Sequence, residues 1–348
     1  MTEPKKRYFA ASNSADGFIN YFPQIFGSGR CQRLYVVKGG PGTGKSCFMK
    51  QVGKVAESKG FPVTYYYCSS DADSLDGLMI GDGEIGLVDG TAPHVWEPET
   101  VGAFEQIVNL GVFWDADTLR CEKEPIHLLM AQKRNSYQGA YHYLSACGQV
   151  LREAEREVIG TVDREKMLRA AERLVRSRGA SRGDYQEHVA LCRAIGMGGR
   201  TRFDTYEGTA SFLYTVEDYG GFGYLFLDAV YQACKLGGIS VCVSRDPLLP
   251  ERIDALQMTE NGVTFSLCGE GIPVHVKRFV KLDAYRKQRS DYKRKLALAE
   301  ELMLIAQGRL DEVKESHFAL EAIYAAAMNF KSKETWTEAF CAKLFCKK

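Results

Sequence analysis

The feature that most constrains this chain is a glycine-rich segment that follows a hydrophobic run and precedes an amphipathic one. The segment consists of Gly39, Gly40, Pro41, Gly42, Thr43, Gly44, Lys45 and Ser46. Residues 33–38 before it are mostly apolar, aromatic or β-branched, which predicts a buried strand. In residues 45–59 after it, apolar side chains recur at helical spacing, at Phe48, Val52, Val55 and Ala56. A strand, a glycine-rich turn and a helix in this order predict an α/β fold.

The glycine-rich segment matches the pattern G-x-x-x-x-G-K-[ST] of phosphate-binding loops, or P-loops. Glycines let backbone N–H groups turn toward phosphate oxygens, and the start of the helix adds a partial positive charge. Lys45 is expected to reach the β- and γ-phosphates of a nucleotide, while the Ser46 hydroxyl binds Mg²⁺. The sequence therefore predicts a site for ATP and Mg²⁺, with nucleotide-binding residues Gly39, Gly40, Pro41, Gly42, Thr43, Gly44, Lys45, Ser46 and Cys47.

Two acidic residues follow the next predicted strand. Residues 62–68 are apolar and aromatic, and they lead into a loop that contains Asp71 and Asp73. If this strand is parallel to the first, its carboxyl end lies at the same edge of the sheet as the P-loop. Either carboxylate could then orient a water or act as a general base, so Lys45, Asp71 and Asp73 are the predicted catalytic residues. The alternative is that these short acids form turns or cap a helix.

A third predicted strand, residues 84–89, ends in Asp89 after an apolar run. An acid in this position supports Mg²⁺ in P-loop proteins, so Ser46 and Asp89 are the predicted metal ligands. The next residue is Gly90 rather than the Glu that activates water in many ATPases, and fast hydrolysis is therefore not predicted. His94, farther along this loop, could face the γ-phosphate or a second substrate, or could be a structural hydrogen bonder.

Length and charge bound the organisation and the partners. A chain of 348 residues exceeds one typical domain, which favours two units. The net charge of +1 argues against a nucleic-acid partner. Between Lys59 and Arg120 there are eleven acidic residues and no Lys or Arg, which predicts an acidic wall suited to Mg²⁺.

Hydropathy and cysteine content predict a cytoplasmic protein without a membrane span. Apolar runs of about 18 residues are absent from the sequence, and its first residues are polar and basic. The eleven cysteines are odd in number and include no C-x-x-C pair, which indicates reduced thiols rather than a zinc site.

Helical patterns follow the three strands. A short helix is predicted over residues 101–108, a long one from Pro125 to about Ile159, and another after Asp163. Glycine-rich joints occur at residues 176–184 and 196–199. We place the domain boundary between these joints, with an active unit at residues 1–180 and a second unit at residues 196–348.

The second half repeats the first in a degenerate form. An offset of 179 places Gly221 on Gly42 and Gly223 on Gly44, but it also places Tyr224 on Lys45 and Leu225 on Ser46. Offsets of 178 and 181 align later segments, the latter placing Glu270 on Asp89. We predict two tandem three-layer α/β cores of the P-loop NTPase fold, the second without the charges that bind phosphate. Each core is followed by long helices, which in the second half cover residues 282–310 and 318–328.

Five segments within roughly the first third of the chain carry a resemblance to known proteins: residues 7–12, 38–46, 68–77, 88–94 and 109–114. They resemble a little-characterised bacterial group of tandem P-loop proteins, described generically as ATPases or nucleotide kinases. The resemblance implies ATP binding. The second half of such proteins often carries its own P-loop, which this chain lacks, so a mechanism that needs two active sites is not expected here.

Three functions are compatible with these patterns. The first is a Mg²⁺-dependent ATPase whose second half regulates or completes the site, with Arg245 or Arg252 either as a finger from that half or in surface salt bridges. The second is a phosphotransferase of nucleotide-kinase type, with Asp71 or Asp73 as the base. The third is a nucleotide switch without hydrolysis. Nucleotide is the predicted ligand, and an unidentified small molecule or protein completes the expected partners.

Overall fold

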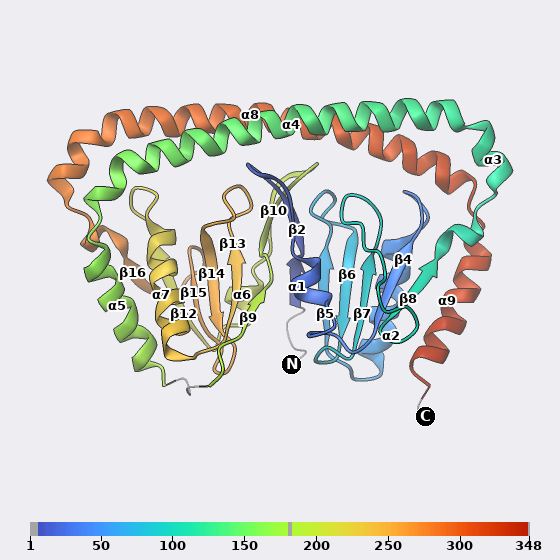
Figure 1. The fold of residues 1–348 in the computed structure, drawn as a ribbon, viewed down its shortest axis with the longest axis horizontal. Helices are drawn as coiled ribbons and strands as arrows, with labels where there is room; N and C mark the ends of the chain where they lie inside the picture. The colour runs from blue at the N-terminus through green and yellow to red at the C-terminus, as the bar shows by residue number, and fades with distance from the viewer. Residues whose placement is uncertain (1–5, 180–182, 347–348) are drawn as a thin grey trace.

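The computed structural model describes residues 6–179 and 183–346 of the chain. Two sheets stand side by side beneath a pair of long helices that spans both of them (Figure 1). This arrangement confirms the predicted α/β class and fits two cores. Residues 180–182, in the predicted joint, lie outside the described residues, and the boundary between residues 1–180 and 196–348 stays a prediction.

The first sheet contains the strand that precedes the P-loop. Its order is β1-β5-β6-β7-β4-β8, and all neighbours are parallel except β6, which is antiparallel to β5 and β7. β5 therefore runs in the same direction as β4, as required to bring Asp71 to the P-loop edge, but β6 and β7 lie between them. The strands are β1 (Lys6–Phe9), β4 (Leu34–Lys38), β5 (Val63–Tyr67), β6 (Leu75–Ile80), β7 (Ile85–Asp89) and β8 (Glu105–Asn109).

The second sheet has the same order and the same strand directions. Its order is β9-β13-β14-β15-β12-β16, and β14 is the strand that runs antiparallel to both of its neighbours. The strands are β9 (Glu187–Val189), β12 (Phe212–Glu217), β13 (Val241–Arg245), β14 (Ile253–Met258), β15 (Val263–Ser266) and β16 (Ile272–His275). The two halves of the chain thus repeat one topology.

Strand registers fix the correspondence between the halves. Val63 pairs with Ile80 and Val241 with Met258, and both ladders shift register at the same place, 178 residues apart. The register of β15 places Leu267, not Glu270, at the position of Asp89. The alignment of Glu270 with Asp89 is therefore wrong, and the second core has lost this acid as well as the lysine.

Helices cover both faces of the first sheet. α2 (Lys45–Ser58) packs on Tyr35 and Val37, whereas α1 (Phe22–Phe26) packs on Leu34 and Val36, which point to the opposite face. In the second sheet, α7 (Gly223–Gly237) and the short α6 (Thr205–Gly208) take the corresponding positions. Burial of alternate residues on both faces of β4 explains its continuous apolar pattern.

Two hairpins join the cores at the centre of the molecule. They are formed by β2 (Ala11–Ser14) with β3 (Gly17–Asn20) and by β10 (Arg193–Gly196) with β11 (Gly199–Arg202). Each hairpin supports the opposite core: Ala15 N donates to Leu248 O at 2.9 Å, and Met197 N donates to Ser70 O at 3.1 Å. The second contact holds the loop that leads to Asp71.

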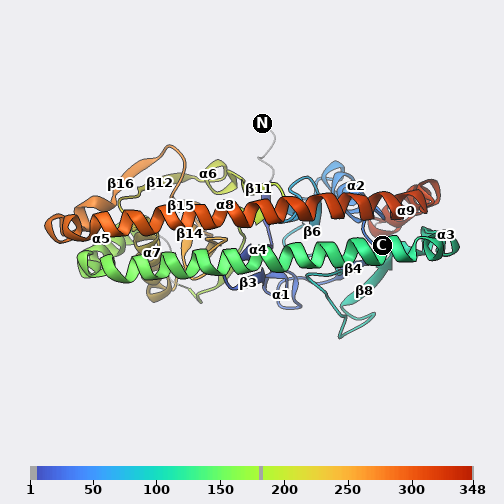
Figure 2. The same ribbon diagram turned by 90° about the horizontal axis from the view of Figure 1, so that it is seen from above.

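Two long helices form an antiparallel pair across the top of the molecule (Figure 2). α4 (Lys123–Val158) has 36 residues and α8 (Leu282–Ala326) has 45, so they extend over about 54 and 68 Å. Small and apolar side chains fill the space between them, namely Ala140, Leu144, Cys147, Ala299, Met303, Ala306 and Leu310. Within the described residues, no helix combines the length and apolar character needed to cross a bilayer.

The helices that follow each core pack against the other core. α5 (Arg164–Ser177), from the first half, lies on α7, and α9 (Phe330–Leu344), from the second half, lies on α2 (Figure 1). One backbone hydrogen bond between the halves holds the chain near each of these helices: Asn329 N donates to Phe113 O at 2.8 Å, and Lys281 N donates to Thr161 O at 2.8 Å. Phe113 belongs to η1 (Leu110–Phe113), Thr161 belongs to η2 (Ile159–Thr161), Lys281 follows η3 (Val276–Phe279), and Asn329 caps α9.

Two predicted helical segments differ from the structure. Residues 105–109 form strand β8 instead of part of a helix, because they pair with β4 at the edge of the sheet. The helices predicted at 282–310 and 318–328 are largely one continuous α8. A short α3 (Ala116–Cys121) precedes α4.

Candidate functional site

Residues 39–46, the predicted P-loop, connect β4 to α2 at the carboxyl edge of the first sheet. Gly42 and Gly44 have φ angles of 68° and 78°, a left-handed conformation that side chains other than glycine rarely adopt. The buried Thr43 hydroxyl donates to Gly40 O at 2.8 Å, which fixes the turn. Pro41 is half-buried within this turn, and Cys47, in the first turn of α2, is exposed.

Lys45 lies at the centre of this loop. Its Nζ donates to Gly39 O at 3.1 Å and to Gly40 O at 2.9 Å, and it lies 3.6 Å from Asp89 Oδ2. The side chains of Lys45 and Asp89 are only 12% and 11% exposed. β4 and β7 are adjacent and parallel, so the predicted lysine and the predicted metal ligand lie beside each other.

The two predicted metal ligands have defined hydrogen bonds. Asp89 Oδ1 accepts from Thr91 N at 2.9 Å and from Thr91 Oγ1 at 2.6 Å, which leaves Oδ2 on the side of Lys45. Ser46 Oγ accepts from Leu75 N at 2.9 Å, so one lone pair of the hydroxyl remains for a cation. This oxygen set suits Mg²⁺, which binds few protein ligands and completes its shell with water and phosphate oxygens. In residues 6–179 and 183–346, His, Cys, Asp and Glu do not gather in threes as a metal site.

Asp71 and Asp73 take different positions in their loop. Asp71 accepts hydrogen bonds from Asp73 N at 3.1 Å and from Ser74 Oγ at 2.7 Å, which is the turn that the alternative interpretation predicted. Asp73 is exposed, and its backbone carbonyl accepts a hydrogen bond from Lys50. The catalytic roles of both residues stay predictions.

His94 is a structural support behind Asp89. Its side chain is 5% exposed, Nδ1 lies 2.9 Å from Asp89 O, and Nε2 lies 3.3 Å from Asp76 Oδ2. Burial alone would lower the pKa of His94, but the Asp76 carboxylate and Asp89 raise it to about 9. The ring also stacks on Phe22, with centroids 4.8 Å apart. The geometry assigns the structural role that the sequence left open.

A roof over the P-loop comes from α8, a helix of the second half. A methyl group built on Gly42 would lie 2.4 Å from Glu321 O, and one built on Gly40 would lie 2.7 Å from the Tyr324 ring. Gly42 therefore requires glycine for a second reason, the close approach of the α8 backbone, and at Gly40 the Tyr324 ring leaves no room for a side chain unless the ring moves.

Charged side chains of both long helices converge beneath this roof. Lys133 of α4 lies with Nζ 3.1 Å from His317 Nδ1 of α8, and His317 Nε2 lies 3.5 Å from Glu321 Oε1. Burial lowers the pKa of Lys133, and burial together with Lys133 lowers that of His317 to about 4. Burial raises the pKa of Glu321, while a hydrogen bond from Gly42 N–H opposes that rise. His317 is thus the neutral acceptor for a buried ammonium.

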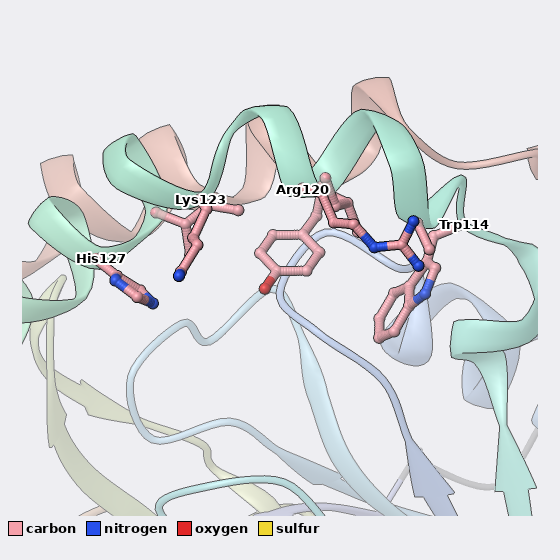
Figure 3. A pocket seen from close by; sticks show the side chains of 8 residues that line it. Trp114, Arg120, Lys123 and His127 are labelled. Atoms are coloured by element: carbon pink, nitrogen blue, oxygen red, sulfur yellow. The ribbon is translucent and has the colours of Figure 1, made fainter.

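A basic and aromatic groove adjoins the P-loop on the β8 side. It has a volume of about 370 Å³, and Tyr324 belongs both to its wall and to the roof over Gly40. Figure 3 shows Lys123 and His127 pointing from α4 toward the first core, near Arg120 and Trp114. The lining residues include three basic side chains and no acid, so the groove favours an anionic, flat ligand.

In the corresponding loop of the second core, a carboxylate of the chain itself occupies the backbone N–H donors. The Asp218 carboxylate accepts from Gly221 N at 2.9 Å and from Gly223 N at 2.5 Å, the kind of donors that a P-loop offers to phosphate. Tyr224, at the position of Lys45, donates to Glu155. The second loop thus carries its own anion.

The two arginines considered as fingers belong to this second core. Arg252 pairs with Glu155 at 2.6 Å, and Arg245 pairs with Glu187 at 2.8 Å. Both guanidinium groups therefore serve the salt-bridge role that the sequence left open.

Sequence reasoning missed the residues that the second half and α4 bring to the loop: Lys133, His317, Glu321 and Tyr324. Their helical, charged surroundings resemble a solvated helix surface, and no local motif marks them. Asp76 is a further residue of this kind, because it lies in β6 and is buried against His94. Comparison of this chain with protein-family models, with curated proteins and with solved structures finds no match.

Proposed function

We propose that this chain binds Mg-ATP at the P-loop of its first core and hydrolyses it slowly. The observation that carries the proposal is the position of Lys45, whose ammonium lies against the P-loop carbonyls and opposite Asp89. Left-handed glycines on both sides of Thr43 present backbone donors at the start of α2, where the helix dipole also favours an anion. The second core, whose loop holds Asp218, serves as a pseudo-NTPase that closes the site through α8 and α9.

Ser46 and Asp89 would hold Mg²⁺, which would neutralise charge on the β- and γ-phosphates. The residues around it explain why slow turnover is expected. A methyl group built on Gly90 would lie 2.4 Å from Val36 Cγ1, so the position after Asp89 has no room for an activating Glu. Orientation of the attacking water then falls to Asp71, which faces the roof residues His317 and Glu321.

The test is Mg-ATP binding by calorimetry, together with phosphate release, in wild type, Lys45→Ala and Lys54→Ala. Lys54 is an exposed residue of α2 and serves as the matched control. We expect Lys45→Ala to lose binding and Lys54→Ala to retain it. Unchanged affinity in Lys45→Ala would overturn the site assignment, and binding without any phosphate release would favour the nucleotide switch instead.

A phosphotransferase is the second candidate, because a groove of about 370 Å³ adjoins the loop at Tyr324. Its basic lining suits an anionic phosphate acceptor. A phosphotransferase would pass the phosphate to such an acceptor, whereas an ATPase passes it to water. In a screen of cell metabolites, Lys123→Glu should impair phosphorylation of the acceptor while leaving ATP binding intact. Water-dependent phosphate release that no metabolite alters would count against this activity.

A further inference from the structure

Lys333 is a buried cation in the first turn of α9. Its residue exposure is 5%, although lysine is rarely this buried without a partner. Within residues 6–179 and 183–346, its Nζ has no hydrogen bond or ion pair, and the contact it makes is with the face of Phe330, 5.6 Å from the ring centre. An aromatic face compensates only a small part of the lost hydration of an ammonium.

The ammonium of Lys333 points at the P-loop. A methyl group built on Gly44 would lie 2.8 Å from Lys333 Nζ and 3.7 Å from Phe330 Cε1. Gly44 is the residue that caps the start of α2, immediately before Lys45. The cation of α9 therefore lies where backbone N–H groups, the dipole of α2 and Lys45 already concentrate positive charge.

This accumulation of positive charge is unfavourable on its own. Partial desolvation of an ammonium is unfavourable unless an opposite charge compensates it, and the positive end of a helix adds to that cost. Two acids lie at the loop, Asp89 beside Lys45 and Glu321 at Gly42 N–H, and within the described residues neither forms an ion pair with Lys333. An anion bound at the start of α2 would satisfy the N–H donors and Lys333 together.

We infer that Lys333 is a second phosphate-binding lysine, which the C-terminal helix of the second half supplies to the P-loop of the first. The inference rests on the proposed function and goes beyond it by naming a ligand-contacting residue outside the motif. The ligand class is a nucleoside di- or triphosphate, because Lys333 lies at the start of α2, where the loop amides bind the inner phosphates. Bound nucleotide would then hold α9 against the first core.

The experiment compares wild type with Lys333→Met and with Lys331→Met, a matched control on the same helix whose side chain is exposed. Calorimetry with Mg-ATP and Mg-ADP should show binding about 10- to 100-fold weaker in Lys333→Met, from the loss of one charge-assisted hydrogen bond. Lys331→Met should stay within about twofold of wild type, since exposed charges contribute little. Lys333→Arg, which keeps the charge, should recover part of the affinity.

Thermal unfolding adds a readout that a purely structural lysine would not produce. Without nucleotide, Lys333→Met should melt at or above the wild-type temperature, because Met keeps the buried apolar stem and removes an ammonium that has no ion pair within the described residues. With nucleotide, its melting temperature should rise less than that of wild type. If the Met variant does not fold, Lys333→Gln is measured in its place.

The outcomes separate the inference from the proposed function. If wild type binds nucleotide and Lys333→Met binds it equally well, the inference fails and the proposed function stands. If wild type binds neither nucleotide nor pyrophosphate, both fail. A loss of affinity that Lys331→Met shares would also overturn the inference, because it would reflect general charge rather than this contact.

Discussion

Replacement of Glu321 by Gln should tighten nucleotide binding. The Glu321 carboxylate receives a hydrogen bond from Gly42 N–H, a donor that the P-loop motif reserves for phosphate, and it lies within the field of Lys45 and Lys133. The Glu321 carboxylate would therefore repel a phosphate bound at the loop. At about 5 Å and an effective dielectric constant of about 20, that repulsion is about 3 kcal/mol. The side chain of Glu321 is 38% exposed, so screening reduces the effect to about half, or roughly tenfold in affinity.

The sign of the pH dependence follows from the same residue. Burial and Asp71 raise the pKa of Glu321, against the opposing effects of Gly42 N–H, Lys45 and Lys133. Protonation removes the repulsion, so wild-type affinity should increase as the pH falls through this raised pKa. Glu321→Gln, which is neutral throughout, should lack that increase.

Calorimetric titration of Mg-ATP between pH 5.5 and 8 measures both effects. Glu315→Gln is the control, because Glu315 is an exposed residue of the same helix. Equal or weaker binding in Glu321→Gln at neutral pH, or a pH profile that it shares with wild type, would refute this reasoning.

Three further predictions concern stability, each measured by urea unfolding. Asp218→Ala should lower the free energy of unfolding by about 1–2 kcal/mol, as for loss of a helix cap, and Asp218→Asn by less; equal losses would contradict the role of the carboxylate. Gly90→Ala should cost about 1–3 kcal/mol through its clash with Val36, whereas Gly160→Ala, which meets no neighbour within 4 Å, serves as control. Leu144→Ala, at a fully buried position between α4 and α8, should cost about 2–5 kcal/mol, and a loss below about 1 kcal/mol would contradict tight packing there.

The sequence predicted the elements whose local signals agree with their surroundings. β4 and α2 lie within one or two residues of their predicted ranges. The apolar run, the glycines and the helical spacing of apolar residues all indicate the same strand, turn and helix. The repeat was also readable, since strand spacing survives even where side chains have changed. The same signals name the residues of the candidate P-loop site, and nucleotide binding by them stays a prediction.

Other elements depend on contacts that no short segment records. β6 contains Asp76 and Gly77, which interrupt its apolar pattern. The buried Asp76 carboxylate pairs with His94, and this pair compensates the cost of burying the acid within the strand. β8 has a pattern compatible with a helix, and pairing with β4 decides its conformation. Tertiary context overrides local preference in such edge strands.

The roof of the candidate site could not be predicted because its residues lie far along the chain. Glu321 of α8 and Lys333 of α9 follow the P-loop by more than 270 of the 348 residues, and α8 crosses both cores before the chain reaches this loop again. Their sequence surroundings are those of a solvated helix. The packing of α8 on α4 brings Glu321 to the loop, and the packing of α9 on α2 brings Lys333 there.

The exchange of α5 and α9 bears on how such a protein could have arisen. A single ancestral half with these contacts would leave its P-loop uncovered, since the covering helix belongs to the other copy. In a domain-swapped dimer of two identical chains, each chain would place its terminal helix over the loop of the other. Joining the two genes would then fix both copies in one chain and allow one of them to lose the lysine and serine of the loop. On this view, the second core persisted as a scaffold because its helix was already indispensable to its twin.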